Sequence, residues 1–246
     1  MGSLPLEGIR VVELGEAWAG PYGGTLLGDM GAEVIKVESI QRVPITRSPL
    51  RPAPGAIGYV GDEPGDRPWE RFDSYNSANR NKMGITLDLT RPKGLTLLKR
   101  LVALSDIVIE NYAAGQVQKL GIDYPALRAV KPDIIMISMP GFGVEGPYKG
   151  FVTLGDSIDA VAGHTALRGY PDEDLSQSSN ILHPDAVAAV TAVFAVLTAL
   201  NFRLRTGEGQ FIDMSQAESV MPHLGAAIMD YTMNGRVQSS LGNRHH

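Results

Sequence analysis

The strongest constraint on the fold is an alternation of short apolar runs with helical segments. Residues 9–15 form a β-rich run, residues 19–31 start a helix after a glycine-punctuated turn, and residues 32–38 form a second apolar run. Near-continuous apolar strands of this kind are typical of a parallel sheet that is covered on both faces. The segment therefore predicts a βαβ unit with a right-handed crossover.

The rhythm is interrupted once and then resumes. Residues 39–76 hold six prolines and five arginines without any period, so we expect a long surface excursion there. The alternation beyond it predicts strands over residues 84–89, 106–112 and 133–142 and helices over residues 91–105, 115–121 and 124–132. This pattern indicates an α/β fold with a Rossmann-like, doubly wound, mostly parallel sheet.

The last third of the chain is mainly helical. We expect a helix over residues 157–167, a long one from Asp185 to about Arg203, a strand within residues 206–215, and a final helix from Gln216 to Arg236. The apolar stretch 186–200 is shorter than the about 20 residues that a membrane span needs. It is therefore interpreted as a buried helix.

Composition and missing motifs exclude several classes of function. The net charge is −5 with no block of like charges, which argues against a nucleic-acid partner. Zero cysteines exclude disulfides, thiolate zinc sites and cysteine nucleophiles. GxSxG, HExxH and GxxxxGK[ST] motifs do not occur, so the hydrolase, metalloprotease and P-loop mechanisms lack their anchors. No basic region precedes an apolar one at the start, and we expect a cytoplasmic protein without a membrane anchor.

Residues 141–146 spell GFGVEG, which matches the dinucleotide fingerprint GxGxxG after a predicted strand. The Rossmann motif needs a helix at its third glycine, whereas the following residues 147–150, Pro-Tyr-Lys-Gly, form a turn signal. We therefore expect a glycine loop at the carboxyl edge of the sheet rather than a nicotinamide or flavin site. Ligands bind at such edges in open α/β sheets.

Two further segments have two interpretations each. Residues 19–24, AGPYGG, lie where a helix N-terminus offers N–H groups to an anion, but their glycines also allow close packing of helix on sheet. Residues 79–82, NRNK, place two cations and two amides directly before a strand. On charge alone this run is more typical of a solvated loop.

Asp185 is the only carboxylate at the start of an otherwise apolar helix. One interpretation is an N-cap, because aspartate is among the best caps and interacts favourably with the positive helix end. The other interpretation is a functional carboxylate. His183 and Asp185 together provide only two potential metal ligands, so no metal site is expected.

Several segments, taken together, resemble one family. They are VVELGEAWAGPYGGTLLGDMGAEVIKVE, NRNKMGITLDL, LSDIVIENYAAGQVQKLGIDYPAL, MPGFGVEGPY and DAVAAVTAVFAVLTALNFRLRTGEGQFIDMSQAES. In this order they resemble the family III CoA-transferases of the CaiB/BaiF type. The resemblance implies transfer of CoA from an acyl-CoA to a free carboxylic acid through covalent intermediates on an aspartate, which falls on Asp185. The helix N-terminus is expected to keep that carboxylate ionised.

The resemblance also implies which residues contact CoA, a substrate rather than a tightly bound cofactor. These residues are Trp18, Ala19, Ser39, Asn79, Arg80, Lys82, Asn111, Gln116 and Lys119, with a substrate loop of Gly141, Phe142 and Gly143. Lys82 and Lys119 are the residues whose type best suits contact with the phosphates of CoA, because both are cations. Trp18 stands where a polar amide is found in formyl-CoA transferase, and Ser39 stands where an arginine is often found. The long excursion hints at a larger or aromatic acid of the benzylsuccinate type.

The family architecture implies an interlocked dimer, a homodimer or a heteromer with a related subunit. Residues 1–215 would form the large CoA-binding domain, and residues 216–246 a helical linker and the start of a second, smaller domain in a truncated chain. Two alternatives remain open. One is a 2-methylacyl-CoA racemase that uses Asp185 and His164 as acid/base groups. The other is a non-catalytic CoA-binding subunit in which Asp185 is only a cap.

Overall fold

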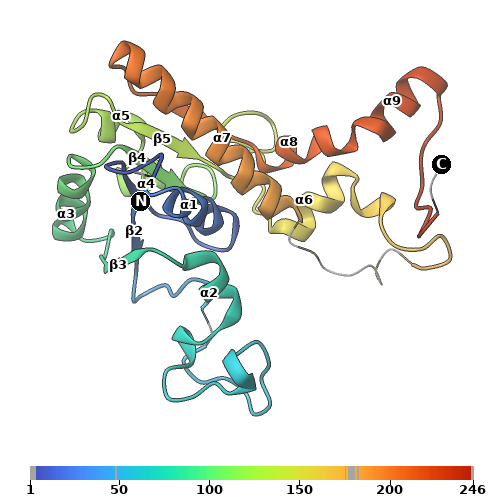
Figure 1. Cartoon of the computed structure of the whole chain (residues 1–246), viewed down its shortest axis with the longest axis horizontal. Coiled ribbons are helices and arrows are strands. Elements are labelled where there is room, and N and C mark those ends of the chain that lie inside the picture. The colour runs from blue at the N-terminus through green and yellow to red at the C-terminus, as the bar shows by residue number, and fades with distance from the viewer. Residues whose placement is uncertain (1–3, 48, 175, 177–180, 182, 245–246) are drawn as a thin grey trace.

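A computed structural model describes residues 4–47, 49–174, 176, 181 and 183–244. In these residues six strands form one sheet in the order β3-β2-β1-β4-β5-β6, and every neighbouring pair is parallel (Figure 1). The strands are β1 (Arg10–Glu13), β2 (Glu33–Glu38), β3 (Met83–Thr86), β4 (Ile107–Glu110), β5 (Ile135–Ser138) and β6 (Phe211–Asp213). The predicted doubly wound parallel sheet is confirmed.

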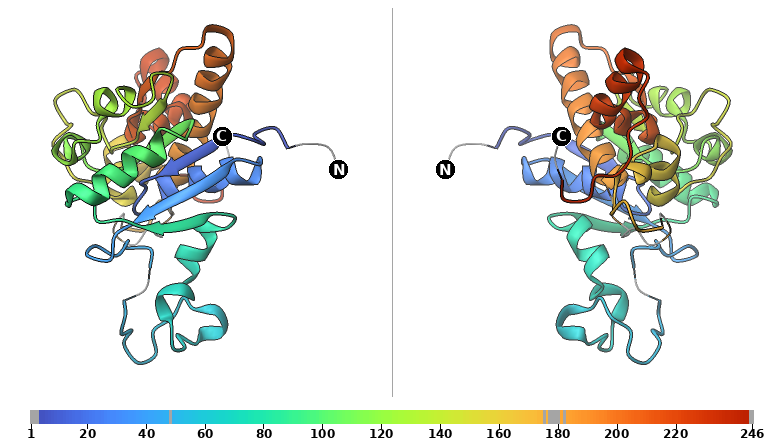
Figure 2. Two further views of the ribbon diagram at one scale, coloured as in Figure 1. Left: turned by 90° about the vertical axis from the view of Figure 1, so that its left-hand side faces the viewer. Right: turned by 90° about the vertical axis from the view of Figure 1, so that its right-hand side faces the viewer.

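Helices cover both faces of this sheet (Figures 1 and 2). One face carries α1 (Ala19–Asp29) and α7 (His183–Thr206), and the other carries α3 (Pro92–Val102), α4 (Gln116–Leu120) and α5 (Tyr124–Arg128). The remaining helices are α2 (Asp73–Asn79), α6 (Gly155–Ala162), α8 (Gln216–Val220) and α9 (Gly225–Asn234).

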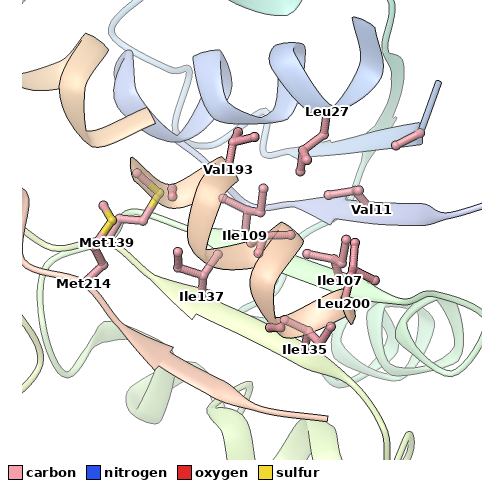
Figure 3. Close-up of a cluster of buried hydrophobic side chains, with 14 of the residues drawn as sticks. Val11, Leu27, Ile107, Ile109, Ile135, Ile137, Met139, Val193, Leu200 and Met214 are labelled. Atoms are coloured by element: carbon pink, nitrogen blue, oxygen red, sulfur yellow. The ribbon is translucent and has the colours of Figure 1, made fainter. Parts of the chain in front are cut away.

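The strands bury side chains on both faces, which explains why their sequences show no polar alternation. Val11, Ile107 and Ile109 point into the cluster beneath α1 and α7 (Figure 3). Val12 and Val108, their neighbours in sequence, belong to the opposite cluster with α3, α4 and α5. Successive side chains on a strand point to opposite faces, so each strand contributes to both cores.

The long helix α7 begins two residues earlier than predicted, at His183. Asp185 is its third residue rather than its N-cap, so the cap interpretation is wrong in position. By length and composition α7 is apolar enough to cross a bilayer. One side of it nevertheless lies in the core on the sheet, through residues that include Ala188, Ala192 and Val196.

The single helix predicted from Gln216 to Arg236 is broken. It consists of α8, a 3₁₀ turn over Met221–Leu224, and α9. Pro222 lies in the first turn of the 3₁₀ segment, and proline cannot donate the N–H bond that would continue an α-helix. α8 packs on α6 through Ala217 and Val220, whereas α9 extends away from the sheet (Figure 1).

The excursion after β2 leaves the sheet and returns through α2 (Figure 1). Arg47 anchors it by donating from Nη2 and Nε to the carboxylate of Glu38 over 2.8 and 3.1 Å. Its Nη1 donates to the carbonyl of Trp69 over 3.0 Å, and its guanidinium lies 3.6 Å from the ring centroid of Tyr75. Arg47 thus ties this proline-rich segment, which has no hydrophobic periodicity, to Glu38 at the end of β2.

Candidate active site

The site lies at the carboxyl edge of the sheet, where the strand order reverses between β1 and β4. In open α/β sheets such a switch point opens a crevice for ligands. Asn111, which follows β4, bridges this crevice to the loop after β1. The backbone N–H of Glu16 donates to its Oδ1 over 2.8 Å, and its Nδ2 donates to the carbonyl of Glu16 over 2.7 Å. This pair of bonds holds the two loops in register.

Asp185 reaches this edge from the first turn of α7. The residue is 7% exposed, and the backbone N–H of Ala19 at the start of α1 lies near enough to the carboxyl to lower its pKa. The pKa of Asp185 is raised to about 6, mainly by burial and to a smaller extent by the neighbouring carboxyl of Asp156, against the lowering by backbone N–H groups. Desolvation thus opposes the helix end that was expected to keep this carboxylate ionised, and it moves the pKa upward. A carboxyl with this pKa is still mainly ionised at neutral pH.

Asp185 lies in the wall between two cavities of about 230 Å³ each, which we call the central cavity and the side cavity. Both cavities share the residues Ala17, Ile45, Leu154, Gly155 and Asp185. The central cavity is also lined by Glu16, Arg42, Asn111, Tyr112, Gln116, Gly141 and Thr153, and the side cavity by Trp18, Thr46, Ser74 and Asp156. The carboxylate can therefore be reached from two sides.

Gly155, the first residue of α6, leaves the space that Asp185 occupies. A Cβ atom at this position would lie 2.2 Å from Oδ2 of Asp185, which is far inside van der Waals contact. Only glycine permits this approach of α6 to the carboxylate.

A third cavity of about 240 Å³, the outer cavity, lies along the ends of β1 and β2. It shares Glu16, Arg42, Tyr112 and Gln116 with the central cavity, so the two are adjacent. Arg42 is the only lysine, arginine or histidine among the described residues that line the three cavities. Its side chain is 70% exposed and lies 3.1 Å from the carboxylate of Glu16. The site thus has one accessible cation at the junction of two cavities.

Five of the predicted contact residues line these cavities. Asn111, Gln116 and Gly141 line the central cavity, Trp18 lines the side cavity, and Ser39 lines the outer one. Ala19 reaches Asp185 through its backbone. The other predicted residues, which do not line these three cavities, are Asn79, Arg80, Lys82, Lys119, Phe142 and Gly143.

Lys82 is not the surface cation that the NRNK run suggested. Its side chain is 3% exposed, and Nζ lies 2.7 Å from Oε2 of Glu13 on β1. The ammonium also donates to the carbonyls of Pro21 and Ala78 and to Oδ1 of Asn79. Burial lowers the pKa of Lys82 to about 8 despite the nearby carboxylate. In this structure the residue connects α1, α2 and β1 rather than facing a ligand.

The glycine loop follows β5 as predicted, and no helix starts within residues 141–146. Phe142 packs with Tyr148 and Phe151, with ring centroids 5.8 and 6.3 Å apart. The loop therefore lacks the helix N-terminus on which a dinucleotide pyrophosphate would sit.

The histidine of the racemase alternative does not face Asp185. Nδ1 of His164 lies 2.7 Å from Oδ1 of Asp159, and its ring stacks on His183 at 4.5 Å. No histidine is among the residues that line the central and side cavities. Within the described part of the chain, no group of three or more histidine, aspartate or glutamate side chains is arranged to hold a metal ion.

Comparison with known proteins places this site in a family. The model of CoA-transferase family III matches residues 6–246. The chain belongs to this family. Succinate–glutarate CoA-transferase from Agrobacterium fabrum is 36% identical over 98% of the chain and 58% of that protein. The alpha and beta subunits of succinyl-CoA–L-malate CoA-transferase from Chloroflexus aurantiacus are each 33% identical, over 97% and 99% of the chain and 53% and 56% of the subunits.

Among solved structures, a CaiB/BaiF family protein from Brucella suis superposes with a TM-score of 0.87 at 36% identity. The match covers 99% of this chain and 61% of that one. The present chain therefore spans between about half and three fifths of the length of these relatives.

Sequence reasoning missed Glu16, Arg42, Thr46, Gly155 and Asp156 at the site. A signal for Arg42 was present, because it follows by three residues the serine that stands in place of a frequent arginine. Gly155 and Thr46 carry no local signal. Their roles depend on which segments the fold brings against Asp185.

Proposed function

We propose that this protein transfers CoA from an acyl-CoA thioester to a free carboxylic acid, with Asp185 as the nucleophile. The observation that carries the proposal is that the Asp185 carboxylate is buried, has no cation beside it, and borders two cavities at the switch point of the sheet. Membership of CoA-transferase family III and the names of the relatives support it.

The chemistry follows from the position of the carboxylate. An oxygen of Asp185 attacks the thioester carbonyl carbon, the C–S bond breaks, and CoA leaves as a thiolate while an acyl–aspartyl anhydride forms. The thiolate then attacks the aspartyl carbonyl, which releases the first acid and leaves an aspartyl–CoA thioester. The acceptor carboxylate attacks the aspartyl–CoA thioester, which releases CoA as a thiolate and forms a second anhydride. The thiolate then attacks the acceptor's carbonyl carbon in this anhydride, which forms the new acyl-CoA and releases the Asp185 carboxylate. A buried site preserves these activated esters because it excludes water.

The Ala19 N–H is the group best placed to assist these steps. It lies near the carboxyl of Asp185 and lowers the pKa of that group. When the aspartyl carbonyl becomes tetrahedral, the same donor would stabilise the negative charge on its oxygen. Because Ala19 is buried at the start of α1, this donor is fixed before the reaction.

The adjacent cavities suit the shape of CoA. We place the reactive end in the central cavity at Asp185 and the nucleotide end in the outer cavity along β1 and β2, where Rossmann-like sheets bind nucleotides. Arg42, at the junction, would contact the pyrophosphate, since phosphate recognition favours arginine. Gln116 lines both cavities and would contact the connecting arm. For the acids, the names of the relatives support succinate, glutarate or malate rather than a benzylsuccinate-type acid.

Trapping of the covalent intermediate tests the proposal. The purified full-length protein is incubated with succinyl-CoA, butyryl-CoA and acetyl-CoA in separate reactions, hydroxylamine is added, and peptides are analysed by mass spectrometry. A hydroxamate on the peptide with Asp185 is expected. Asp185→Asn should abolish it, whereas Asp172→Asn, an exposed aspartate outside the cavities, should not. No adduct with any donor would overturn the proposal.

Two further measurements on the same protein and its variants separate the transferase from the racemase and from the non-catalytic subunit. A racemase would exchange the α-proton of a 2-methylacyl-CoA in D₂O without forming a hydroxamate, and this exchange would be lost in His164→Ala. A non-catalytic subunit would bind CoA, and its complex would retain full activity with Asp185→Asn. Loss of transfer with retained folding supports the transferase.

We also propose that the protein works as an assembly of related subunits. Two relatives are named as the alpha and beta subunits of one transferase. The outer side of α7 leaves Val190, Phe194 and Leu204 between 57% and 83% exposed, which is unusual for large apolar side chains on one helix. Light scattering of the purified full-length protein is expected to give a dimer, and a monomeric mass would contradict this.

A further inference from the structure

Ala17 has a strained backbone conformation at the edge of the site. Its φ is 56°, in the left-handed region that residues with a Cβ atom rarely adopt. The other described non-glycine residues with a positive φ are Asp62 and Asn81, two types that enter this region more easily than alanine. Ala17 lines both the central and the side cavity. Such a conformation persists only where the surrounding structure enforces it, and such residues cluster at functional sites.

Asn111 makes the contacts that enforce this conformation. Its Oδ1 accepts from the N–H of Glu16 over 2.8 Å, and its Nδ2 donates to the carbonyl of Glu16 over 2.7 Å. That carbonyl belongs to the peptide group between Glu16 and Ala17, so the second bond fixes one side of the strained φ. Gly20 makes room for the amide, because a Cβ atom there would lie 2.9 Å from Oδ1 of Asn111.

The strained residue sets the direction in which α1 starts. Ala17 is followed by Trp18, which is the N-cap, and by Ala19, which is the first residue of the helix. The N-cap side chain makes no capping hydrogen bond, and the first N–H groups of a helix have no partner inside it. The N–H of Ala19 lies near the Asp185 carboxyl instead and lowers its pKa. A change in φ at Ala17 would redirect this N–H, since only one residue separates the two.

We propose that Asn111 is a positioning residue, which holds Ala17 in the left-handed conformation and thereby keeps the Ala19 N–H beside the Asp185 carboxyl. This inference rests on the proposed transfer at Asp185. A donor that is fixed before the reaction stabilises developing negative charge without any cost of reorganisation. The family resemblance implies instead that Asn111 contacts CoA, and the two roles predict different kinetics.

The test is Asn111→Ala made with and without Ala17→Gly, with succinyl-CoA as donor and glutarate as acceptor. Loss of both amide bonds lets Ala17 relax, so we expect kcat to fall about 10- to 100-fold, with KM for the acyl-CoA within about threefold of wild type. Glycine adopts a positive φ without strain, so adding Ala17→Gly should raise kcat of Asn111→Ala about fivefold or more. Ala113→Gly is the matched control, because Ala113 lines the central cavity without a positive φ. It should not rescue Asn111→Ala.

The pH profile is a second readout that a general loss of structure would not move. Transfer needs the ionised Asp185, and the Ala19 N–H favours this form. The acidic limb of kcat/KM should therefore shift to higher pH in Asn111→Ala and return when Ala17→Gly is added. The other ionisable side chains that line the central and side cavities are the same in every variant: Glu16, Arg42, Tyr112 and Asp156.

A fall confined to KM for the acyl-CoA, or a fall in kcat that Ala17→Gly does not rescue, overturns the inference. An unchanged kcat in Asn111→Ala also overturns it. Circular dichroism checks that each variant is folded, and Asn111→Ser, with its shorter side chain, replaces the alanine variant if that one does not fold. Hydroxamate trapping on the wild type with the three donors named above tests the transferase separately. No adduct refutes the transfer itself, whereas an adduct together with a failed rescue refutes only the role of Asn111.

Discussion

Two carboxylates, Glu13 and Asp185, are both buried but have opposite surroundings. Glu13, at the end of β1, is fully buried, and its two oxygens lie 2.7 Å from the ammonium groups of Lys36 and Lys82. Asp185, at the start of α7, is nearly as buried but has backbone N–H groups and another carboxyl beside it. A buried charge is tolerated when it is paired. The unpaired carboxylate is the one that borders the cavities, and shifted pKa values cluster at functional sites.

The largest expected effect removes the paired carboxylate. Glu13→Gln leaves Lys36 and Lys82 buried without a counter-charge, and loss of one partner of a buried pair costs about 3–5 kcal/mol of the free energy of unfolding. Glu33→Gln is the matched control, because the Arg10–Glu33 pair is exposed and contributes at most about 1 kcal/mol. Urea unfolding followed by circular dichroism measures both. Equal losses in the two variants would contradict the comparison.

Asp185→Asn is expected to act in the opposite direction on stability. The pKa of Asp185 is about 6 in the folded protein against an ordinary 3.8, so the folded state binds the proton more tightly. Between these values the free energy of unfolding therefore falls as pH rises, by roughly 3 kcal/mol in total. The asparagine variant removes this loss, and it should be more stable than wild type at pH 8 and about equal near pH 4. A variant that is less stable at pH 8 would show that the carboxylate is structural.

Gly155→Ala sharpens the comparison at the active carboxylate. Its Cβ would lie 2.2 Å from Oδ2 of Asp185, so the carboxylate must move, and displacement of a nucleophile by about 1 Å is expected to reduce transfer about 10- to 100-fold. Gly225→Ala is the control, because a Cβ there meets no atom within 4 Å. Steady-state kinetics with a common donor measures both variants. Unchanged kcat in Gly155→Ala would mean that the carboxylate has room to move.

Arg42→Gln gives the smallest expected effect. Its pair with Glu16 is exposed, so the free energy of unfolding should change by less than about 1 kcal/mol. If the central and outer cavities bind CoA as proposed, loss of the only lysine, arginine or histidine among the described residues that line them should raise KM for the acyl-CoA about five- to tenfold and weaken its dependence on salt. Arg67→Gln, which removes another exposed arginine away from these cavities, should leave KM unchanged. A rise in both variants would indicate only a general charge effect.

The sheet was predictable because it depends on local patterns. Apolar runs such as residues 9–15 and 106–112 became β1 and β4, since strands covered on both faces need apolar side chains at every position. The helix from Gln216 was predicted too long because Pro222 was not weighed as a helix breaker. The domain boundary at residue 215 stays a prediction.

The site was only partly predictable. Residue type alone made Lys82 a candidate for contact with phosphate, yet the fold buries this lysine against Glu13. Residue type lent no such prominence to Arg42, which the fold leaves exposed. Charge is visible in a sequence, but exposure depends on packing between segments far apart along the chain. The roles of Asn79, Arg80 and Lys119 stay predictions.

The sequence by itself determined the parallel α/β class, the glycine loop after β5, and the family to which the chain belongs. These follow from periodicity and from ordered motifs, which are properties of neighbouring residues. Only the tertiary structure decided that Asp185 is buried between two cavities and that Gly155 makes room for it. The burial of Asp185, its close contact with Gly155 and its raised pKa depend on how α1, α6, α7 and the excursion pack together, and no single segment determines that packing.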